Sequence, residues 1–145
     1  MRLIKRIRAF LTKKPSPELE TEDSAFGSIK FDRNGWVREI DFGSSTLLLY
    51  INADTLGPTD AQRELWVQSK SNLSRYDELA SKIIRNECAE DLPTRELVLR
   101  EIWIHPDEYH ENEEMMLVYD NPCDSDGVYR ASFRLGEVLH AGRDD

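Results

Sequence analysis

The spacing of apolar residues over 26–51 predicts three antiparallel strands. Ile29 and Phe31 alternate with polar residues, Asn34-Gly35 follows, and the apolar residues Trp36, Val37 and Ile40 come next. Asn-Gly at this place is typical of a tight hairpin, because both turn positions need a positive φ. Residues 46–51 are apolar on both faces of the predicted strand, so we expect a central strand that is well covered.

The period of the apolar residues becomes helical after Pro58. Thr59 and Gln62 have the spacing of a capping box, in which each side chain bonds the backbone of the other residue. No Gly or Pro interrupts residues 59–90, which predicts one long helix, or two nearly collinear helices that break near residues 72–74. One face of this helix collects most of its apolar residues and one serine: Trp66, Ser69, Leu73, Tyr76, Ala80 and Ile83.

Strand patterns return after Pro93, with a tight turn predicted at Asp126-Gly127. They cover four runs: 97–104, 115–119, 128–134 and 137–140. The predicted fold class is therefore α+β. It consists of an antiparallel sheet of about six or seven strands, three before the helix and three or four after it, with the long helix packed on one face.

The chain divides into three predicted segments. Residues 1–14 form a short basic amphipathic helix, 15–24 a linker rich in proline and acidic residues, and 25–145 a single α+β domain. Two interpretations of residues 1–14 stay open: the helix packs on the domain, or it lies on a surface of anionic lipid. Its apolar residues recur at helical spacing: Leu3, Ile4, Ile7, Phe10 and Leu11.

The charge of the chain is divided unevenly. Residues 1–14 carry +6 without an acidic residue, and because the whole chain of 145 residues carries −9, residues 15–145 carry −15. A domain this acidic repels nucleic acid and attracts basic proteins. Two cysteines, Cys88 and Cys123, are too few for a disulfide framework, and with no secretory signal we expect a cytoplasmic protein.

The densest polar cluster is the predicted loop 105–114, which contains His105 and His110 among carboxylates. Two histidines near acids could bind a transition metal and serve a metal-dependent hydrolase. The spacing is His-x4-His in a loop, whereas a zincin carries His-Glu-x-x-His on one helix face. We therefore expect a solvated hairpin tip without a stoichiometric metal.

No other motif predicts catalysis. The Asp-rich segment 120–127 lacks the first and last ligands of a calcium loop, where Pro122 and Phe133 stand. The chain has no phosphate loop and no Gly-x-Ser-x-Gly motif. We expect no enzyme, no cofactor, and no catalytic or metal-binding residues. The aromatic residues at core-compatible positions are Trp36, Trp66, Tyr76 and Trp103.

Three stretches of the domain carry a resemblance to a known group. They are the hairpin Phe26-Gly-Ser-Ile-Lys-Phe to Ile40-Asp-Phe-Gly, the run Leu48 to Asp54 with Pro58, Thr59 and Gln62, and the ending Val128-Tyr-Arg-Ala-Ser-Phe with Gly136-Glu-Val. Together they span most of residues 26–140. The pattern resembles small bacterial domains that are grouped with the immunity proteins of polymorphic toxin systems. The resemblance implies a cytoplasmic protein that binds and neutralises a toxin.

The sequence thus favours a non-catalytic protein-binding module of immunity type, and a basic toxin or other basic protein is the partner it favours. Electrostatic steering toward a basic toxin fits the acidic domain. Two alternatives are kept, a membrane-peripheral adaptor that uses residues 1–14 and a metal-dependent hydrolase that uses His105 and His110. No nucleic acid partner is expected, weak association with a membrane surface is kept open, and the oligomeric state is not fixed by the sequence.

Overall fold

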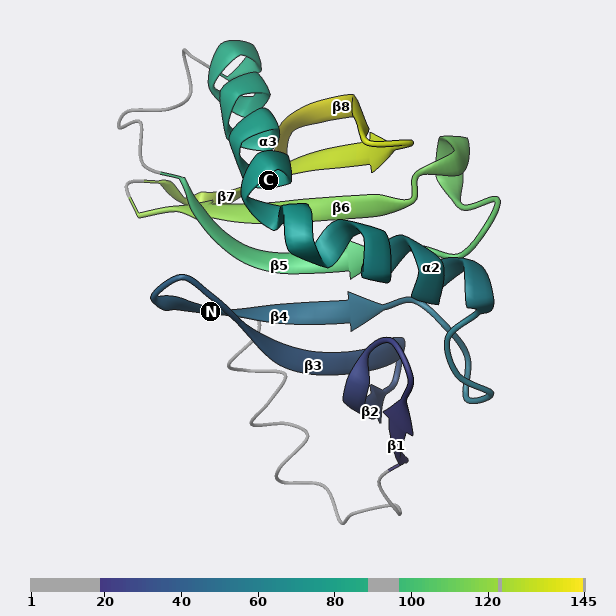
Figure 1. Ribbon diagram of the computed structural model, residues 1–145. Coiled ribbons are helices and arrows are strands. Elements are labelled where there is room, and N and C mark those ends of the chain that lie inside the picture. Colours follow the sequence, from purple (N-terminus) through teal and green to yellow (C-terminus); the bar gives the residue numbers. More distant parts are fainter. Residues whose placement is uncertain (1–18, 89–96, 123, 145) are drawn as a thin grey trace.

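The computed structural model describes residues 19–88, 97–122 and 124–144 (Figure 1). The predicted helix at 1–14 and Cys123 lie outside these residues. The described elements, in chain order, are β1 (Glu20–Asp23), β2 (Gly27–Asp32), β3 (Gly35–Phe42), β4 (Ser45–Ile51), α2 (Asp60–Ser69), the 3₁₀ turn η1 (Lys70–Asn72), α3 (Leu73–Glu87), β5 (Val98–Ile104), the 3₁₀ turn η2 (His110–Asn112), β6 (Met115–Asn121), β7 (Asp124–Arg134) and β8 (Glu137–Asp144).

The predicted α+β class is confirmed, with an eight-stranded sheet in the order β1 to β8. The sheet therefore has more strands than the six or seven expected. All neighbouring strands are antiparallel except β4 and β5, which pair in parallel. The helices explain this exception, because a crossover long enough to contain a helix returns the chain to the end of the sheet from which it left.

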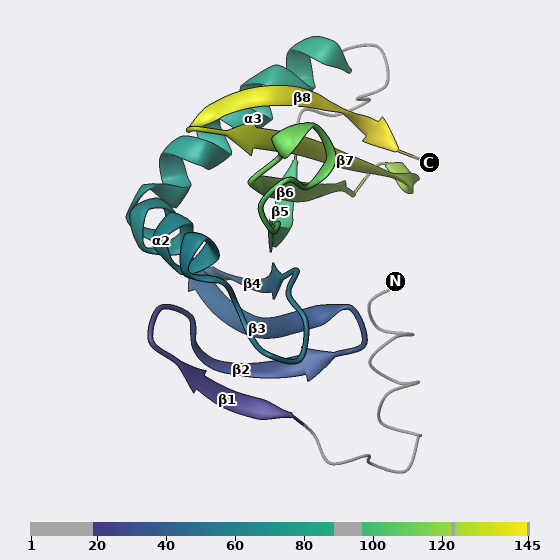
Figure 2. The same ribbon diagram turned by 90° about the vertical axis from the view of Figure 1, so that its right-hand side faces the viewer.

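The long helical segment is confirmed as well, and it covers one face of the sheet (Figure 2). The Thr59 hydroxyl accepts from the Gln62 N–H and the Gln62 side chain accepts from the Thr59 N–H, so the predicted capping box is present. The segment breaks at η1, next to the predicted position. Rather than being nearly collinear, α2 and α3 run in different directions in Figure 1.

The core lies between the helices and the covered face of the sheet. Trp66 is 6% exposed and its ring stacks on Phe26, with 6.1 Å between ring centroids. Trp36 is buried too, and its indole N–H donates to the carbonyl of Asp54. The phenol of Tyr119 on β6 donates to the Asp77 carboxylate, which fastens α3 to the sheet. The core positions expected for Trp36 and Trp66 are confirmed.

Strand β1 corrects the prediction of a linker over 15–24. Residues 20–23 pair antiparallel with residues 27–30, and their side chains are mostly exposed. The edge strand is held by backbone hydrogen bonds and by Asp23, whose carboxylate accepts from the N–H groups of Ala25 and Phe26 and pairs with Arg63 at 2.8 Å. None of these contacts requires apolar alternation, so the sequence pattern did not indicate a strand.

Two turns also differ from their predictions. The β2–β3 turn falls on Arg33 and Asn34, and Gly35 begins β3, where a side-chain carbon would lie 2.4 Å from the carbonyl oxygen of Ile51. The glycine is thus needed for a close backbone approach as well as for the turn. Asp126-Gly127 forms no turn and lies inside β7, where the Arg143 side chain crosses Gly127.

The other face of the sheet carries no helix among the described residues (Figure 2). Tyr50 on β4 and Trp103 on β5 stack there, with ring centroids 4.3 Å apart, and both are half-buried. We call this the open face. Residues 46–51 were predicted to be covered on both faces. Among the described residues, helices cover one of these faces only. None of the described helices has the length and apolar character needed to cross a bilayer.

Candidate functional site

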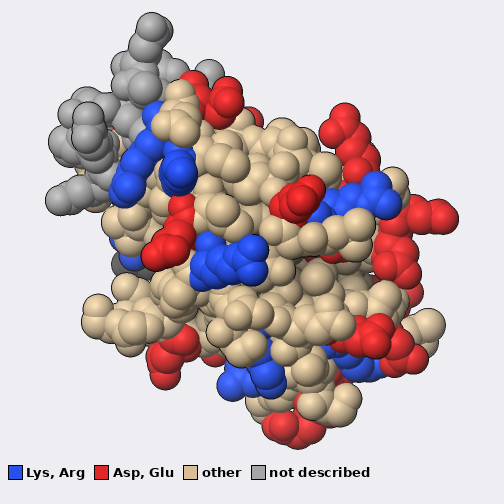
Figure 3. Space-filling model, turned by 45° about the horizontal axis from the view of Figure 1, so that its top comes forward, with Lys and Arg blue, Asp and Glu red and all other residues tan. Residues whose placement is uncertain are grey.

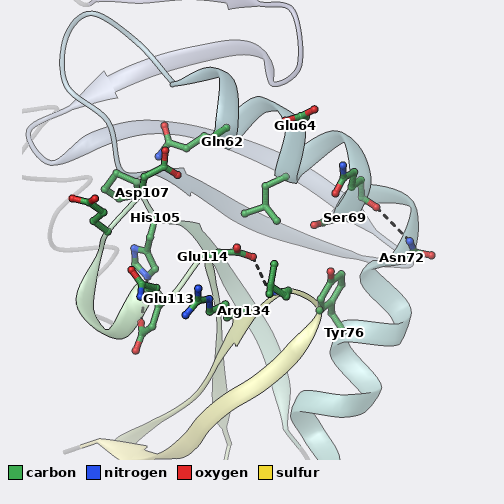
Figure 4. Close-up of a pocket in the computed structure, with 18 residues that line it drawn as sticks. Gln62, Glu64, Ser69, Asn72, Tyr76, His105, Asp107, Glu113, Glu114 and Arg134 are labelled. Carbon is green, nitrogen blue, oxygen red and sulfur yellow. Dashed lines mark hydrogen bonds and ion pairs between the residues drawn. The ribbon is translucent and has the colours of Figure 1, made fainter.

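A cleft of about 670 Å³ lies between α2, the β5–β6 segment and the β7–β8 turn (Figure 4). The helix supplies one wall because its capping box and Trp66 hold it against the sheet. The end of β5 and the loop after it supply the opposite wall. The residues that matter for its chemistry are Gln62, Glu64, Ser69, Tyr76, His105, Asp107, Glu108, Glu113, Glu114, Arg134 and Leu135.

Glu113 joins two histidines at this cleft. Its carboxylate lies 3.8 Å from Nε2 of His105 and 2.5 Å from Nε2 of His140 on β8. His105 and Glu113 are both buried, which corrects the expected solvated hairpin tip. His110 is exposed, and the ring of Tyr109 lies against the rings of both His105 and His110. The two histidines considered for a metal therefore do not converge, and His105 instead meets a carboxylate shared with His140.

Burial governs the protonation of His105. The side chain is 3% exposed and loses hydration, which lowers the pKa of the imidazole from 6.5 to about 4, although the nearby Glu113 carboxylate acts in the opposite direction. His105 is therefore neutral at neutral pH. Neither of its ring nitrogens has a hydrogen-bond partner among the residues that the structure describes. A neutral imidazole offers one donor and one acceptor to a ligand in the cleft.

Two buried polar residues of α2 also line the cleft. Gln62 is fully engaged, since its side chain donates to the carbonyl of Asn52 and accepts from the N–H of Thr59. Ser69 is 1% exposed, and its hydroxyl has no hydrogen-bond partner in the described part of the chain. A buried polar atom without a partner costs about 1–3 kcal/mol. Ser69 is therefore a group whose partner a ligand would supply.

The β7–β8 turn places an apolar side chain at the mouth of the cleft. Leu135 has a φ of 51° and is 78% exposed. Its backbone N–H donates to the Glu114 carboxylate at 3.0 Å, which holds the turn against the β5–β6 segment. Leucine rarely adopts a positive φ, and such strain clusters at functional sites.

The cleft is strongly acidic. Five of its lining residues are acidic and Arg134 is its one lysine or arginine among the described residues. Acidic side chains gather along the right-hand edge of the molecule in Figure 3, the side on which the β5–β6 segment lies in Figure 1. A concave surface with one sign of charge focuses the field and attracts ions of the opposite sign.

A second cleft of about 430 Å³ lies between α3 and the ends of β3, β4 and β5. Its charged residues balance, with Asp77 and Glu78 against Lys82 and Arg85. It therefore lacks the single sign of charge that distinguishes the first cleft, and the first cleft is the candidate site.

Sequence reasoning located part of this site. It singled out residues 105–114, but missed His140 and the turn at Leu135, which only the fold brings to them. A serine on the apolar helix face was the available signal for Ser69. Within residues 19–88, 97–122 and 124–144, no three histidine, cysteine or acidic side chains come together as a metal site.

The segment 120–127, considered as a calcium loop, is organised by an ion pair. Arg143 on β8 holds the Asp124 carboxylate at 2.7 Å, and the Tyr129 hydroxyl donates to the same carboxylate. These contacts hold the pKa of Asp124 well below its usual range, with the Arg143 hydrogen bond as the largest cause. The Asp124 carboxylate thus serves to connect β7 with β8.

Comparison with known proteins adds no relative: no family model, no curated protein and no solved structure matches the chain.

Proposed function

We propose that this protein is a non-catalytic protein-binding module of immunity type, which binds a basic partner protein at the acidic cleft. The observation that carries the proposal is the excess of carboxylates in a concave surface with Arg134 as the counter-charge. Such a surface steers a basic partner by long-range attraction and raises the association rate at low salt. A cytoplasmic toxin of basic character is the class of partner that fits best.

Leu135 supports a protein partner over a simple ion. An exposed leucine beside a charged cleft provides the apolar contact that protein interfaces place among polar groups. The strained backbone at this residue suggests selection for the side chain rather than for the turn, because asparagine or glycine would suit a φ of 51° better.

The geometry at Ser69 and His105 favours binding over catalysis. A serine nucleophile requires a base that accepts its proton through a hydrogen bond. Ser69 Oγ and both ring nitrogens of His105 make no hydrogen bond among the described residues. The polar groups of the cleft are therefore better suited to contacting a ligand than to activating one another.

The basic helix predicted at 1–14 is part of the same proposal. Its apolar spacing and the half-buried apolar open face favour docking on the domain over attachment to a membrane surface.

The test of the proposed function uses the gene neighbourhood to choose the partner. A toxin encoded beside this gene is expressed in a bacterial host with and without this protein. We expect growth to be restored by coexpression, and the purified pair to bind with a dissociation constant that rises with salt.

The decisive variant is Leu135→Asn. Asparagine tolerates the positive φ, so the fold should be as stable or more stable, while partner binding weakens about tenfold or more through loss of the apolar contact. Leu56→Asn is the matched control, because Leu56 is 93% exposed on the β4–α2 loop and does not line the cleft. Unchanged protection and binding in Leu135→Asn, or no protection by the wild type, would overturn the proposal.

A further inference from the structure

The interior of the cleft contains polar groups that the domain itself leaves unsatisfied. Within residues 19–88, 97–122 and 124–144, Ser69 Oγ and both ring nitrogens of His105 have no hydrogen-bond partner, although both side chains are more than nine-tenths buried. They come from opposite walls, α2 and the end of β5, and line the same cavity (Figure 4). Unsatisfied groups on facing walls are expected where a bound group completes the hydrogen bonding.

The acidic residues near Ser69 and His105 indicate the charge of a group that would bind in the cleft. Glu113 lies 3.8 Å from His105 and also pairs with His140 at 2.5 Å, and one oxygen of Glu114 accepts from the Leu135 N–H. Both residues line the cavity, as does the ring of Tyr76. Two carboxylates, a hydroxyl and a neutral imidazole are mostly acceptors, so the bound group must be a donor with positive charge.

We propose, on the basis of the function proposed above, that the interior of the cleft receives one arginine side chain of the partner protein. A guanidinium presents five N–H donors in a plane, which can serve acceptors on several walls, and its face can stack on an aromatic ring. A lysine ammonium has three donors around one nitrogen and suits acceptors that converge on one point. The acceptors here belong to different elements, which favours the guanidinium.

Arg134 limits the affinity of this pocket. It lines the same cavity, so its charge opposes that of an entering guanidinium. Its removal should therefore strengthen binding, whereas removal of an acceptor should weaken binding. Opposite effects from neighbouring residues would not arise from a general loss of structure.

The experiment titrates the full chain with capped arginine, N-acetyl-arginine amide, and follows backbone amide shifts by NMR. Shifts should concentrate at residues 105–114 and 134–136, with a dissociation constant on the order of 1 mM for a ligand of this size. The capped citrulline analogue has the same shape without the charge and should produce no saturable shifts. Capped lysine should bind at least threefold more weakly than capped arginine.

Four variants sharpen the titration. Ser69→Ala should weaken binding of capped arginine about threefold, and Glu114→Gln about tenfold, since glutamine keeps an acceptor for the Leu135 N–H. Arg134→Gln should strengthen binding about threefold. Glu39→Gln, an exposed acid on β3 outside the cleft, should leave it unchanged.

Three outcomes would overturn the arginine pocket: equal binding of capped citrulline, equal or tighter binding of capped lysine, or no saturable shift at 20-fold the expected constant, about 20 mM. These results are distinct from failure of the proposed function. If the cleft does not bind capped arginine but Leu135→Asn still abolishes protection, only the arginine pocket is refuted. Binding of capped arginine with protection unaffected by Leu135→Asn refutes the partner-binding role of the cleft mouth.

Discussion

The two faces of the sheet are built from the same strands but differ in what covers them. On β4, Leu47, Leu49 and Ile51 point to the helices and are at most 1% exposed. Leu48 and Tyr50 alternate with them on the open face and are half-buried. Both sets are apolar, so the composition of the strand does not decide burial. The position of α2 and α3 decides it, and that position follows from the capping box and the crossover to β5.

The open face also mixes charge with its apolar residues. Leu48 stands beside Glu39 on β3 and Glu101 on β5, and the Trp103 indole N–H donates to Glu101. The covered face of the same strands is mostly apolar, with Arg38 opposite Leu49 as its charged residue on β3. A face that alternates aromatic and acidic side chains is suited to a cover that is both apolar and basic, which is the character of residues 1–14.

The largest expected difference between the faces is between two tryptophans. Trp66→Ala should lower the free energy of unfolding by about 3–5 kcal/mol, because it leaves a cavity beside Phe26 in the packed core. Trp103→Ala on the open face should cost about 1 kcal/mol, mainly through loss of the stack on Tyr50. Urea unfolding followed by circular dichroism measures both. Equal losses would show that the open face is packed as tightly as the core.

The second expected effect tests the burial of the His105 imidazole. The unfolded chain takes up a proton at His105 below pH 6.5, whereas the folded protein does so only below about 4. Stability should therefore fall by about 3 kcal/mol as the pH drops from 6.5 to 4, and this loss should be absent above pH 7. The groups that face the ring are Glu113, Tyr109 and, through its charge, His110.

His105→Phe isolates this contribution, since phenylalanine keeps the stack on Tyr109 and does not titrate. Urea unfolding between pH 4 and 7 should show a shallower acid loss in this variant than in the wild type. His140→Gln is the control, because the His140 side chain is 51% exposed and should leave most of the slope intact. Identical slopes in wild type and His105→Phe would show that the imidazole is hydrated in solution.

The contrast also explains which parts of the fold were predictable. Strands β2, β3 and β4 and the segment 60–87 carry local alternation or a cap, and the sequence locates them within a few residues. Strand β1 has no apolar alternation, since it depends on backbone pairing and on Asp23 reaching Arg63 across 40 residues. The turn predicted at Asp126-Gly127 was wrong, because the β6–β7 hairpin closes earlier, where Asn121 pairs with Asp124.

The candidate site also has one part that the sequence indicates and another that only the fold reveals. The polar run 105–114 is visible in the composition, but the composition does not show that His105 is buried against Tyr109 or that Glu113 is buried and pairs with His140 of β8. Leu135 carried no signal, because a leucine before a glycine does not normally occupy a positive φ. Sites assembled from three separate segments are set by tertiary packing, which local patterns do not encode.

The third expected effect tests whether residues 1–14 cover the open face. Deletion of residues 1–14 should lower the free energy of unfolding by about 2 kcal/mol, as expected if a few of its five large apolar side chains are buried on the domain. It should also shift the fluorescence of Trp103 toward longer wavelength, with Trp103→Phe as the control that removes this shift. Thermal melting and sedimentation with anionic vesicles are measured on both chains. Unchanged melting together with lost vesicle binding would contradict docking and make the protein peripheral to the membrane.

The smallest expected effect concerns the start of α2, the helix that covers the other face of the sheet together with α3. Thr59→Ala removes the hydroxyl that accepts from the Gln62 N–H, and an N-cap of this kind contributes about 1 kcal/mol. Thr59→Ser should retain nearly all of the free energy of unfolding, because serine caps a helix equally well. Gln62→Ala should lower the free energy of unfolding more than Thr59→Ala does, because the Gln62 side chain also donates to the carbonyl of Asn52 after β4. Urea unfolding of the three variants gives the order. If serine were as damaging as alanine, the methyl group of Thr59 rather than its hydrogen bond would hold the helix start. In that case the position of α2, and with it the difference between the two faces, would depend on packing at the helix end instead of on the capping box.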